Sequence, residues 1–379
     1  MRSGLKLTIS GLIIIAVIFS SNPNPYISIL SGNDGRTDEF EIENTNNKAD
    51  TLRIAYFPNL NHAPAIIQHE NGDFNATSYK YKLSNITVSS TSYTSERSII
   101  EALYGDKTDV AFVNPSTIID AYILLGNQDF RIISGLSSGG VSFVVRNDSG
   151  IESVNDLGGK TFASPHLGNS QDVALRKYLT NNGFDTVENG GNVTVVALKP
   201  SSIISQFQNK GIDGAWVPEP IPTILKQQAN GKIFVDERDL WPDGKFVTGN
   251  IIVRTDYLRE NPDVIKKLLE SHVDETSWIN ERLLNANSNG DRNNDSEIVY
   301  AFNSGLENIT GKTYPDNILG EALSRIEFTV DPLSNSLQKI VEDADHLGLI
   351  RMGLNWNEEF KKIYDVTLLD EVLRQKGIK

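Results

Sequence analysis

Cysteine is absent from the 379-residue sequence. The chain therefore cannot form a disulfide or a thiolate metal site, use a thiol as a nucleophile, or carry a lipid on an N-terminal cysteine. Basic residues are also few, because 35 Lys and Arg stand against 49 Asp and Glu and give a net charge of −14. An acidic chain without a clustered Lys/Arg run is a poor partner for nucleic acid or for an anionic membrane surface.

Long apolar runs are lacking as well. The clearest one, Leu12 to Phe19, is much shorter than the ~20 residues of a membrane-spanning helix. With Arg2 and Lys6 before it, this run has the layout of an export signal, and we expect the rest of the chain to be extracytoplasmic. No clear cleavage site follows, so residues 1–30 are either a cleaved signal peptide or an N-terminal membrane anchor. The polar, acidic residues 31–50 are predicted to be a disordered linker.

What is present is typical of a globular α/β protein. Hydrophobic residues make up 39% and charged residues 22% of a chain long enough for two domains. From Thr51 onward, short apolar strand-like segments alternate with helical segments, which predicts two βαβ domains with mostly parallel sheets. Two strands, near residues 141 and 249, are expected to cross between the domains as a hinge, and the helical C-terminal tail is expected to cover the first domain. The predicted boundaries are 51–140 and 250–379 for the first lobe and 141–249 for the second.

One strand-to-helix junction stands out, in the segment DGAWVPEPIPTIL of residues 213–225. An apolar strand, Ala215 to Val217, stops at the rigid Pro218 to Pro220 turn, and a helical segment follows. Such a junction would bring Trp216 and Glu219 to the open edge of a sheet, where α/β proteins bind their ligands.

Other junctions of the same kind carry small neutral polar residues where helices are expected to begin. Helix N-termini bind anions through unpaired N–H groups, without a full positive charge nearby. An oxyanion would therefore suit these junctions even in an acidic protein. Glu219 is awkward in such a site: either the ligand also offers a donor such as an amine, or the glutamate braces the loop. The residues in question are Asn61, His62, Asn114, Ser116, Asn169, Ser170 and Gln171.

Catalytic chemistry finds little support. Gly135 to Gly139 match the GxSxG pattern of a hydrolase, but a strand follows where that motif requires a helix. Small residues at such a position more often let a ligand approach the backbone. The five histidines have no metal-ligand spacing, so we expect no catalytic residues, no metal site and no cofactor.

Six segments along the chain carry a family resemblance. They are LRIAYFPNLNHAPAI (52–66), DVAFVNPS (109–116), LGNSQDVALRKYL (167–179), DGAWVPEP (213–220), VDERDLWPDGKFVT (235–248) and YDVTLLDEVL (364–373). They resemble, in the same order, segments of the extracytoplasmic substrate-binding proteins of ABC importers, in the branch that serves sulfonates, taurine and nitrate. The resemblance implies a two-lobed periplasmic-binding-protein-like (type II) fold, which closes like a hinge on a small solute and then docks to a permease with its ATPase. Beyond the junction residues, it implies ligand contacts from Ser138, Gly139 and Gly140.

The resulting hypothesis is a monomeric binding protein, not an enzyme, whose ligand is a small organic anion such as an aliphatic sulfonate. Within the same class, nitrate or bicarbonate is an alternative, as is an aminopyrimidine stacked on Trp216 with its amine on Glu219. Two alternatives come from other classes. One is a surface sensory module, and the other is an enzyme that makes a thiamine pyrimidine precursor.

Overall fold

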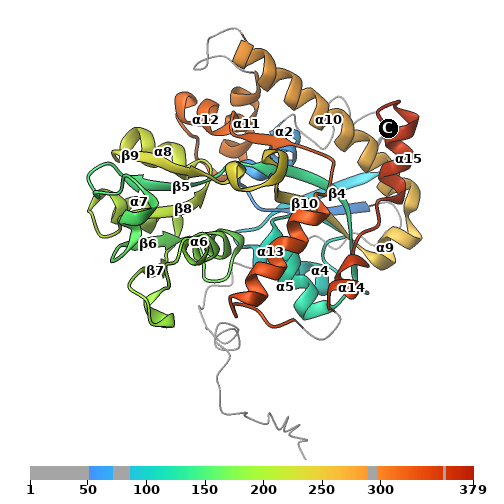
Figure 1. Cartoon of the computed structure of the whole chain (residues 1–379). Helices are drawn as coiled ribbons and strands as arrows, with labels where there is room; N and C mark the ends of the chain where they lie inside the picture. The colour runs from blue at the N-terminus through green and yellow to red at the C-terminus, as the bar shows by residue number, and fades with distance from the viewer. Residues whose placement is uncertain (1–50, 71–85, 289–296, 353–355) are drawn as a thin grey trace, which may run out of the picture. The chain divides into compact units, whose positions relative to one another are not determined.

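The computed structural model describes residues 51–70, 86–288, 297–352 and 356–379. The predictions for the export signal and the linker, residues 1–50, lie outside these ranges. Two β-sheets organise the described chain (Figure 1). In spatial order, the six strands of the first sheet are β11 (Ile326–Phe328), β4 (Phe130–Gly139), β10 (Val247–Arg254), β3 (Val110–Val113), β1 (Thr51–Tyr56) and β2 (Thr87–Ser92). Those of the second sheet are β7 (Thr194–Ala197), β6 (Thr161–Ser164), β8 (Gly214–Pro218), β5 (Val141–Arg146) and β9 (Gly231–Asp236).

Helices lie on both faces of the first sheet (Figure 1). One face and its helices share a large apolar core with Ile66, Phe112 and Leu268. The helices that contribute to that core are α2 (Ala63–Glu70), α10 (Pro262–Ser288), α11 (Glu297–Thr310), α12 (Asp316–Leu323) and α15 (Thr367–Gln375). The remaining helices of this lobe are α4 (Glu96–Tyr104), α5 (Pro115–Leu125), α9 (Thr255–Glu260), α13 (Ser334–His346) and α14 (Trp356–Lys361). Among the described helices, none combines the length and the apolar character needed to cross a membrane.

The second sheet is also covered on both faces. The helix α6 (Ser170–Asn181) covers one face, and α7 (Pro200–Gln208) and α8 (Ile221–Gln228) cover the other. Successive side chains of a strand point to opposite faces. In β8, Ala215 and Val217 therefore pack toward α7 and α8, whereas Trp216 packs toward α6.

The chain crosses between the sheets twice, which gives the two-lobed fold predicted from the sequence. It leaves the first sheet at Gly140, between β4 and β5, and returns between β9 and β10. Gly140 has a φ of +71°, and a Cβ atom there would lie 2.5 Å from Ile326 Cγ1, so the position requires glycine. The sheets are mixed rather than mostly parallel. Their parallel strands are β1, β2 and β3 in one sheet and β6, β7 and β8 in the other. In the first sheet β10 pairs antiparallel with β3, and in the second β5 pairs antiparallel with β8.

The C-terminal tail contacts both lobes, although it was expected to cover only the first. Lys226 on α8 pairs with Glu321 on α12 at 2.7 Å, and Lys177 on α6 pairs with Asp343 on α13 at 3.2 Å. The tail is not helical throughout, because α12 ends at Leu323 and Ile326 enters the short strand β11. The strand β9 was not anticipated either.

A buried histidine joins α10 to the middle of β4. His272 has no exposed surface, and its Nε2–H donates to the Gly135 carbonyl at 2.9 Å. Burial lowers the pKa of His272 to about 4. Gly135 is itself confined, because a Cβ atom there would lie 1.9 Å from the Asp331 carbonyl oxygen. The glycine at the start of the GxSxG match, Gly135, is therefore explained by close packing of the chain against β4.

His272 should make the fold sensitive to acid. Its folded-state pKa lies below the ordinary value of 6.5, so its contribution to stability is present above about pH 6.5 and is lost as the pH falls through about 4. We expect this group to account for roughly 2–3 kcal/mol of the decrease in unfolding free energy. Urea unfolding at pH 7 and pH 4 should show a smaller decrease for His272→Gln than for the wild type. His346→Gln, which changes an exposed histidine of α13, should leave the decrease unchanged, and an equal effect of both substitutions would contradict the assignment.

Candidate functional site

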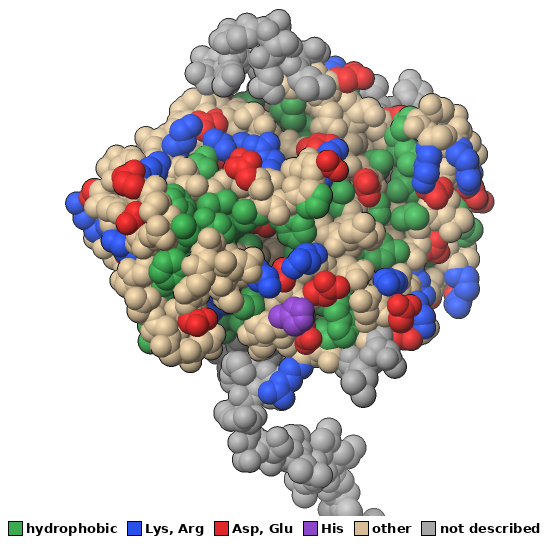
Figure 2. All heavy atoms as spheres, viewed as in Figure 1, with side chains coloured by type: hydrophobic (Ala, Val, Ile, Leu, Met, Phe, Trp, Pro, Cys, Tyr) green, Lys and Arg blue, Asp and Glu red, His purple; other side chains and the backbone are tan. Residues whose placement is uncertain are grey.

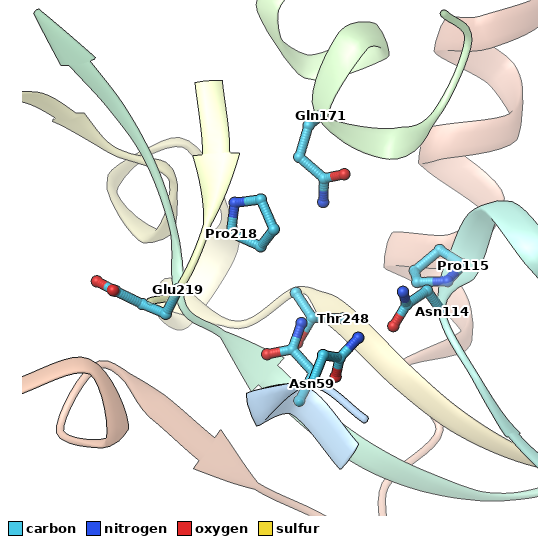
Figure 3. A pocket seen from close by; sticks show the side chains of 8 residues that line it. Asn59, Asn114, Pro115, Gln171, Pro218, Glu219 and Thr248 are labelled. Atoms are coloured by element: carbon cyan, nitrogen blue, oxygen red, sulfur yellow. The ribbon is translucent and has the colours of Figure 1, made fainter. Parts of the chain in front are cut away.

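A small cavity of about 50 Å³ lies between residues of the two lobes (Figure 3). The second lobe contributes Gln171 from the first turn of α6, together with Pro218 and Glu219 at the end of β8. The first lobe contributes residues that follow β1 and β3, and one from β10. These are Asn59, Asn61, Asn114, Pro115 and Thr248.

The topology explains why the cavity forms here. Parallel strands β1 and β3 end at one edge of the first sheet, and β6 and β8 end at one edge of the second. Residues that follow such strands gather at the carboxyl edge, where open α/β sheets bind ligands. The cavity is lined by four amide side chains, the Thr248 hydroxyl, two prolines and Glu219, and no Lys or Arg among the described residues lines it.

Two helices begin at the cavity and face each other across the lobes. Pro115 is the first residue of α5, and Ser170 is the first residue of α6. The backbone N–H of Ser170 donates to Ser116 Oγ at 3.0 Å, which links the two helix starts directly. Asn169 caps α6, because its side chain accepts from the Asp172 N–H at 2.9 Å. The partial positive charges of the two helix N-termini therefore act together at the cavity.

A partly buried hydrogen-bond network holds Asn114 in the cavity wall. His62 Nε2–H donates to Asn114 Oδ1 at 3.1 Å, and Asn114 Nδ2–H donates to the Glu96 carboxylate. Thr117 also donates to Glu96, at 2.5 Å. Burial lowers the pKa of His62 to about 4, so the ring is neutral near pH 7. His62 therefore supports the site from behind and does not itself line the cavity.

Glu219 is braced by an arginine from the C-terminal tail. Its side chain has no exposed surface, and Oε1 lies 3.4 Å from Arg325 Nε. Oε2 accepts from the Thr223 N–H at 3.2 Å. Burial raises the pKa of Glu219 to about 7, and hydrogen bonding from Thr223 and the charge of Arg325 oppose that rise. In Figure 3 the carboxylate points away from the other labelled side chains. This geometry matches the bracing role that the sequence had left as one of two possibilities.

The structure gathers some of the predicted residues and separates others. Asn61, Asn114, Gln171 and Glu219 line the cavity. Ser116, Asn169 and Ser170 form the adjoining helix starts, and Gly139 and Gly140 form the crossing between lobes. Ser138 instead accepts from the Phe246 N–H at 3.2 Å.

Trp216 lies apart from the cavity, within the core of the second lobe. Its side chain has no exposed surface and stacks on Phe143 with the ring centroids 5.4 Å apart. Its Nε1–H donates to Glu237 Oε2 at 2.6 Å. The expected delivery of this ring to the edge of the sheet does not occur, because α6 covers the face of the sheet to which Trp216 points.

Sequence reasoning missed five residues of this region. Asn59 and Pro115 adjoin predicted residues, and Pro218 belongs to the proline turn already singled out. Thr248 follows the second crossing, so its position in the hinge was a usable signal. No sequence signal pointed to Arg325, because it lies 106 residues beyond Glu219 in the sequence. In the described part of the chain, no group of His, Asp and Glu side chains could hold a metal ion.

A profile of the NMT1-like family matches residues 45–289, well over half of the chain. The chain belongs to the NMT1-like family. The match begins just before β1 and extends through the second lobe into the region of α10, so it includes every strand that ends at the cavity. The family resemblance predicted from the sequence is confirmed.

Individual relatives agree with this membership. A protein of Brucella abortus (strain 2308), described as a binding protein, is 28% identical to this NMT1-like chain over 171 residues, which cover 45% of the chain and 50% of the relative. The chain thus spans about half the length of the curated relatives that it matches. The taurine-binding periplasmic protein of Escherichia coli (strain K12) is 26% identical over 193 residues, which cover 51% of the chain and 58% of that protein.

A solved structure supports the fold. The periplasmic aliphatic sulphonate binding protein SsuA from Escherichia coli superposes on this NMT1-like chain with a TM-score of 0.64 and 16% sequence identity. The superposition covers 82% of this chain and 91% of SsuA. The chain therefore has the two-lobed α/β fold of periplasmic binding proteins, as its sequence predicted.

Proposed function

We propose that the chain is the solute-binding component of an ABC importer and that it captures a small organic anion, an aliphatic sulfonate in the first instance. The observation that carries this proposal is the cavity between the lobes. Two helix N-termini, four neutral amide groups and the Thr248 hydroxyl meet there, and Glu219, the one carboxylate among the described lining residues, is paired with Arg325. Such a site stabilises an anion with partial charges and hydrogen bonds.

Gln171 is the strongest candidate for a direct ligand contact. Its amide makes no hydrogen bond to another described residue, and Figure 3 shows it reaching from the start of α6 toward the first lobe. Asn61 faces it from the first lobe, and its Oδ1 atom is buried without a hydrogen-bond partner among the described groups. A buried polar atom without a partner is costly, so a ligand that supplies the missing bonds would be favoured.

Hinge closure would be the mechanism. A solute that contacts Gln171 and the first lobe together stabilises the closed state by its higher affinity for that state. A membrane permease would then recognise the closed lobes and receive the solute, with the energy supplied by its ATPase. The names of the Escherichia coli relatives support this class of function, in which the chain binds and releases a solute outside the cytoplasm without catalysing a reaction.

A smaller oxyanion such as nitrate or bicarbonate is the second candidate. The volume of about 50 Å³ favours it, because sites for larger organic ligands typically enclose about 300–1,000 Å³. An aminopyrimidine stacked on Trp216 has less support, because that ring is fully buried.

Thermal unfolding of the purified chain with millimolar ligands should separate these candidates. We expect ethanesulfonate and taurine to raise the unfolding midpoint, since a ligand at about 100 times its Kd adds about 2.7 kcal/mol to native-state stability. Gln171→Ala should weaken sulfonate binding about tenfold in calorimetric titration, because a hydrogen bond to a charged group is lost. Gln208→Ala, which removes an exposed amide at the end of α7, is the matched control and should not change the affinity. A shift with nitrate or bicarbonate alone would assign the second function, and unchanged affinity in Gln171→Ala would refute the cavity as the site.

A further inference from the structure

A much larger groove of about 1,070 Å³ begins at Ser170, next to the smaller cavity, and runs between α6 of the second lobe and α13 of the first. One side is formed by α6 and by the connection that follows β9, and the other side by α13 and the residues that precede it. Figure 2 is drawn from the side on which α6 and α13 face the viewer, and hydrophobic, basic and acidic side chains gather around a hollow there. The groove and the sulfonate cavity have no lining residue in common.

A buried carboxylate forms part of the groove wall. Glu237 is only 5% exposed, and it accepts hydrogen bonds from Trp216 Nε1 at 2.6 Å and Trp241 Nε1 at 3.3 Å. No Lys, Arg or His of the described chain forms an ion pair with it, although buried carboxylates ordinarily have a cationic partner. Burial raises the pKa of Glu237 to about 7, and the two indole donors oppose that rise without supplying a full positive charge. A cation in the groove would supply the missing charge.

With Glu237 counted, the charged side chains that line the groove include more carboxylates than lysines. Lys177 and Lys339 both pair with Asp343, and Lys245 pairs with Glu327 at 2.8 Å. Asp343 thus balances only one of the two lysines that contact it, while Glu327 balances Lys245. Asp243 and Asp331 also line it, and neither forms an ion pair with a described residue. Among the described residues that line the groove, four carboxylates therefore stand against three lysines, a formal excess of one negative charge.

Apolar and aromatic side chains supply the rest of the wall. Trp241 stacks on Phe246 with the ring centroids 5.6 Å apart, which holds the indole ring at the groove. Tyr178 of α6 lines the same side of the groove, and Leu240 is 49% exposed beside Trp241. Aromatic faces attract cations and also bury apolar groups, so these residues suit a ligand that has both.

We propose that this groove is a second small-molecule site, which binds an organic cation consisting of a primary ammonium group on an apolar or aromatic body. The ammonium group pairs with Glu237, and the apolar body lies against Trp241 and Leu240. The ligand proposed here is a cation, whereas the ligand proposed for the smaller cavity is an anion.

Calorimetric titration of the full chain with 2-phenylethylamine tests the site. The amine should bind, whereas 2-phenylethanol, which has nearly the same shape but no charge, should bind at least about tenfold more weakly. Glu237→Gln should reduce amine affinity by about tenfold or more, because it removes the charge and keeps a similar side-chain volume. Glu358→Gln is the matched control. It removes one negative charge from an exposed position on α14 and should leave the affinity unchanged.

A second variant avoids any change to the core. Leu240→Lys places a positive charge at an exposed position of the groove, so it should weaken amine binding without destabilising the fold. Ethanesulfonate binding should be the same in both groove variants, which separates failure of this site from failure of the cavity. Equal binding of 2-phenylethylamine and 2-phenylethanol, or full amine affinity in both groove variants, would overturn the proposal.

Discussion

Trp216→Ala is expected to lower the free energy of unfolding by about 3–5 kcal/mol, the usual cost of removing a large aromatic side chain from a core. The Trp216 side chain has no exposed surface, and its ring lies 5.4 Å from Phe143 and 5.5 Å from Tyr178 between centroids. The substitution also removes the indole donor from the buried Glu237. Urea unfolding at pH 7, followed by circular dichroism, measures the loss.

The same variant separates a core role from a ligand-binding role. Under native conditions, the folded fraction of Trp216→Ala should keep the sulfonate affinity of the wild type, because the side chain does not line the cavity. Trp278→Ala, at a partly buried position on α10, serves as the control and should be less destabilising. A Trp216→Ala protein that is stable but has lost sulfonate binding would show that the ring faces the ligand, contrary to the structure.

Arg325→Met should be the second most damaging substitution, with an expected loss of about 3 kcal/mol at pH 8. It leaves the fully buried Glu219 carboxylate without its cation, and removing one partner of a buried ion pair typically costs about 3–5 kcal/mol. We place the loss at the lower end because 19% of the Arg325 side chain is exposed. Arg325 also pairs with Asp236 at 3.5 Å and with Glu321 at 3.2 Å, and both of these pairs are lost.

This loss should depend on pH in a defined direction. Burial raises the folded-state pKa of Glu219 to about 7 from an ordinary value of 4.5. The stability that this group contributes is therefore fully present below about pH 4.5 and is lost as the pH rises through about 7. Without Arg325 the carboxylate is harder to ionise. Arg325→Met should consequently be least damaging near pH 5, when Glu219 is protonated, and most damaging at pH 8.

Two further variants complete the test of this ion pair. Adding Glu219→Gln to Arg325→Met should restore much of the stability at pH 8, because no buried charge is then left unpaired. Lys226→Met removes an exposed partner of Glu321 and should cost only about 0–1 kcal/mol. A loss for Arg325→Met that is the same at pH 5 and pH 8 would rule out Glu219 as its source.

Local chemistry made the strand-to-helix junctions predictable. The run Val110 to Val113 forms β3, and Pro115 begins α5, because proline is favoured at the first position of a helix. Asn169 caps α6 because its side chain accepts a hydrogen bond from the first turn of the helix. This fixes the start of α6, and Gln171 in that turn lines the cavity. These outcomes depend on a few consecutive residues, so the sequence alone was sufficient.

The direction in which Trp216 points was not predictable in this way. A strand that is covered on only one face reveals its buried side by alternating apolar and polar residues. In β8 both faces are covered, by α6 on one side and by α7 and α8 on the other, so Ala215, Trp216 and Val217 are all apolar. The sequence showed that the strand is buried, but it could not show which layer receives the tryptophan.

The sequence by itself determined the family, the two-lobed α/β fold and the helix starts that meet at the cavity, because each of these is encoded in local segments. The tertiary structure alone decided that Arg325 braces Glu219, that Trp216 belongs to the core, and that Glu237 lines a second groove. The physical reason is distance along the chain. Such contacts join segments far apart in the sequence, and they form only when the C-terminal tail packs against both lobes.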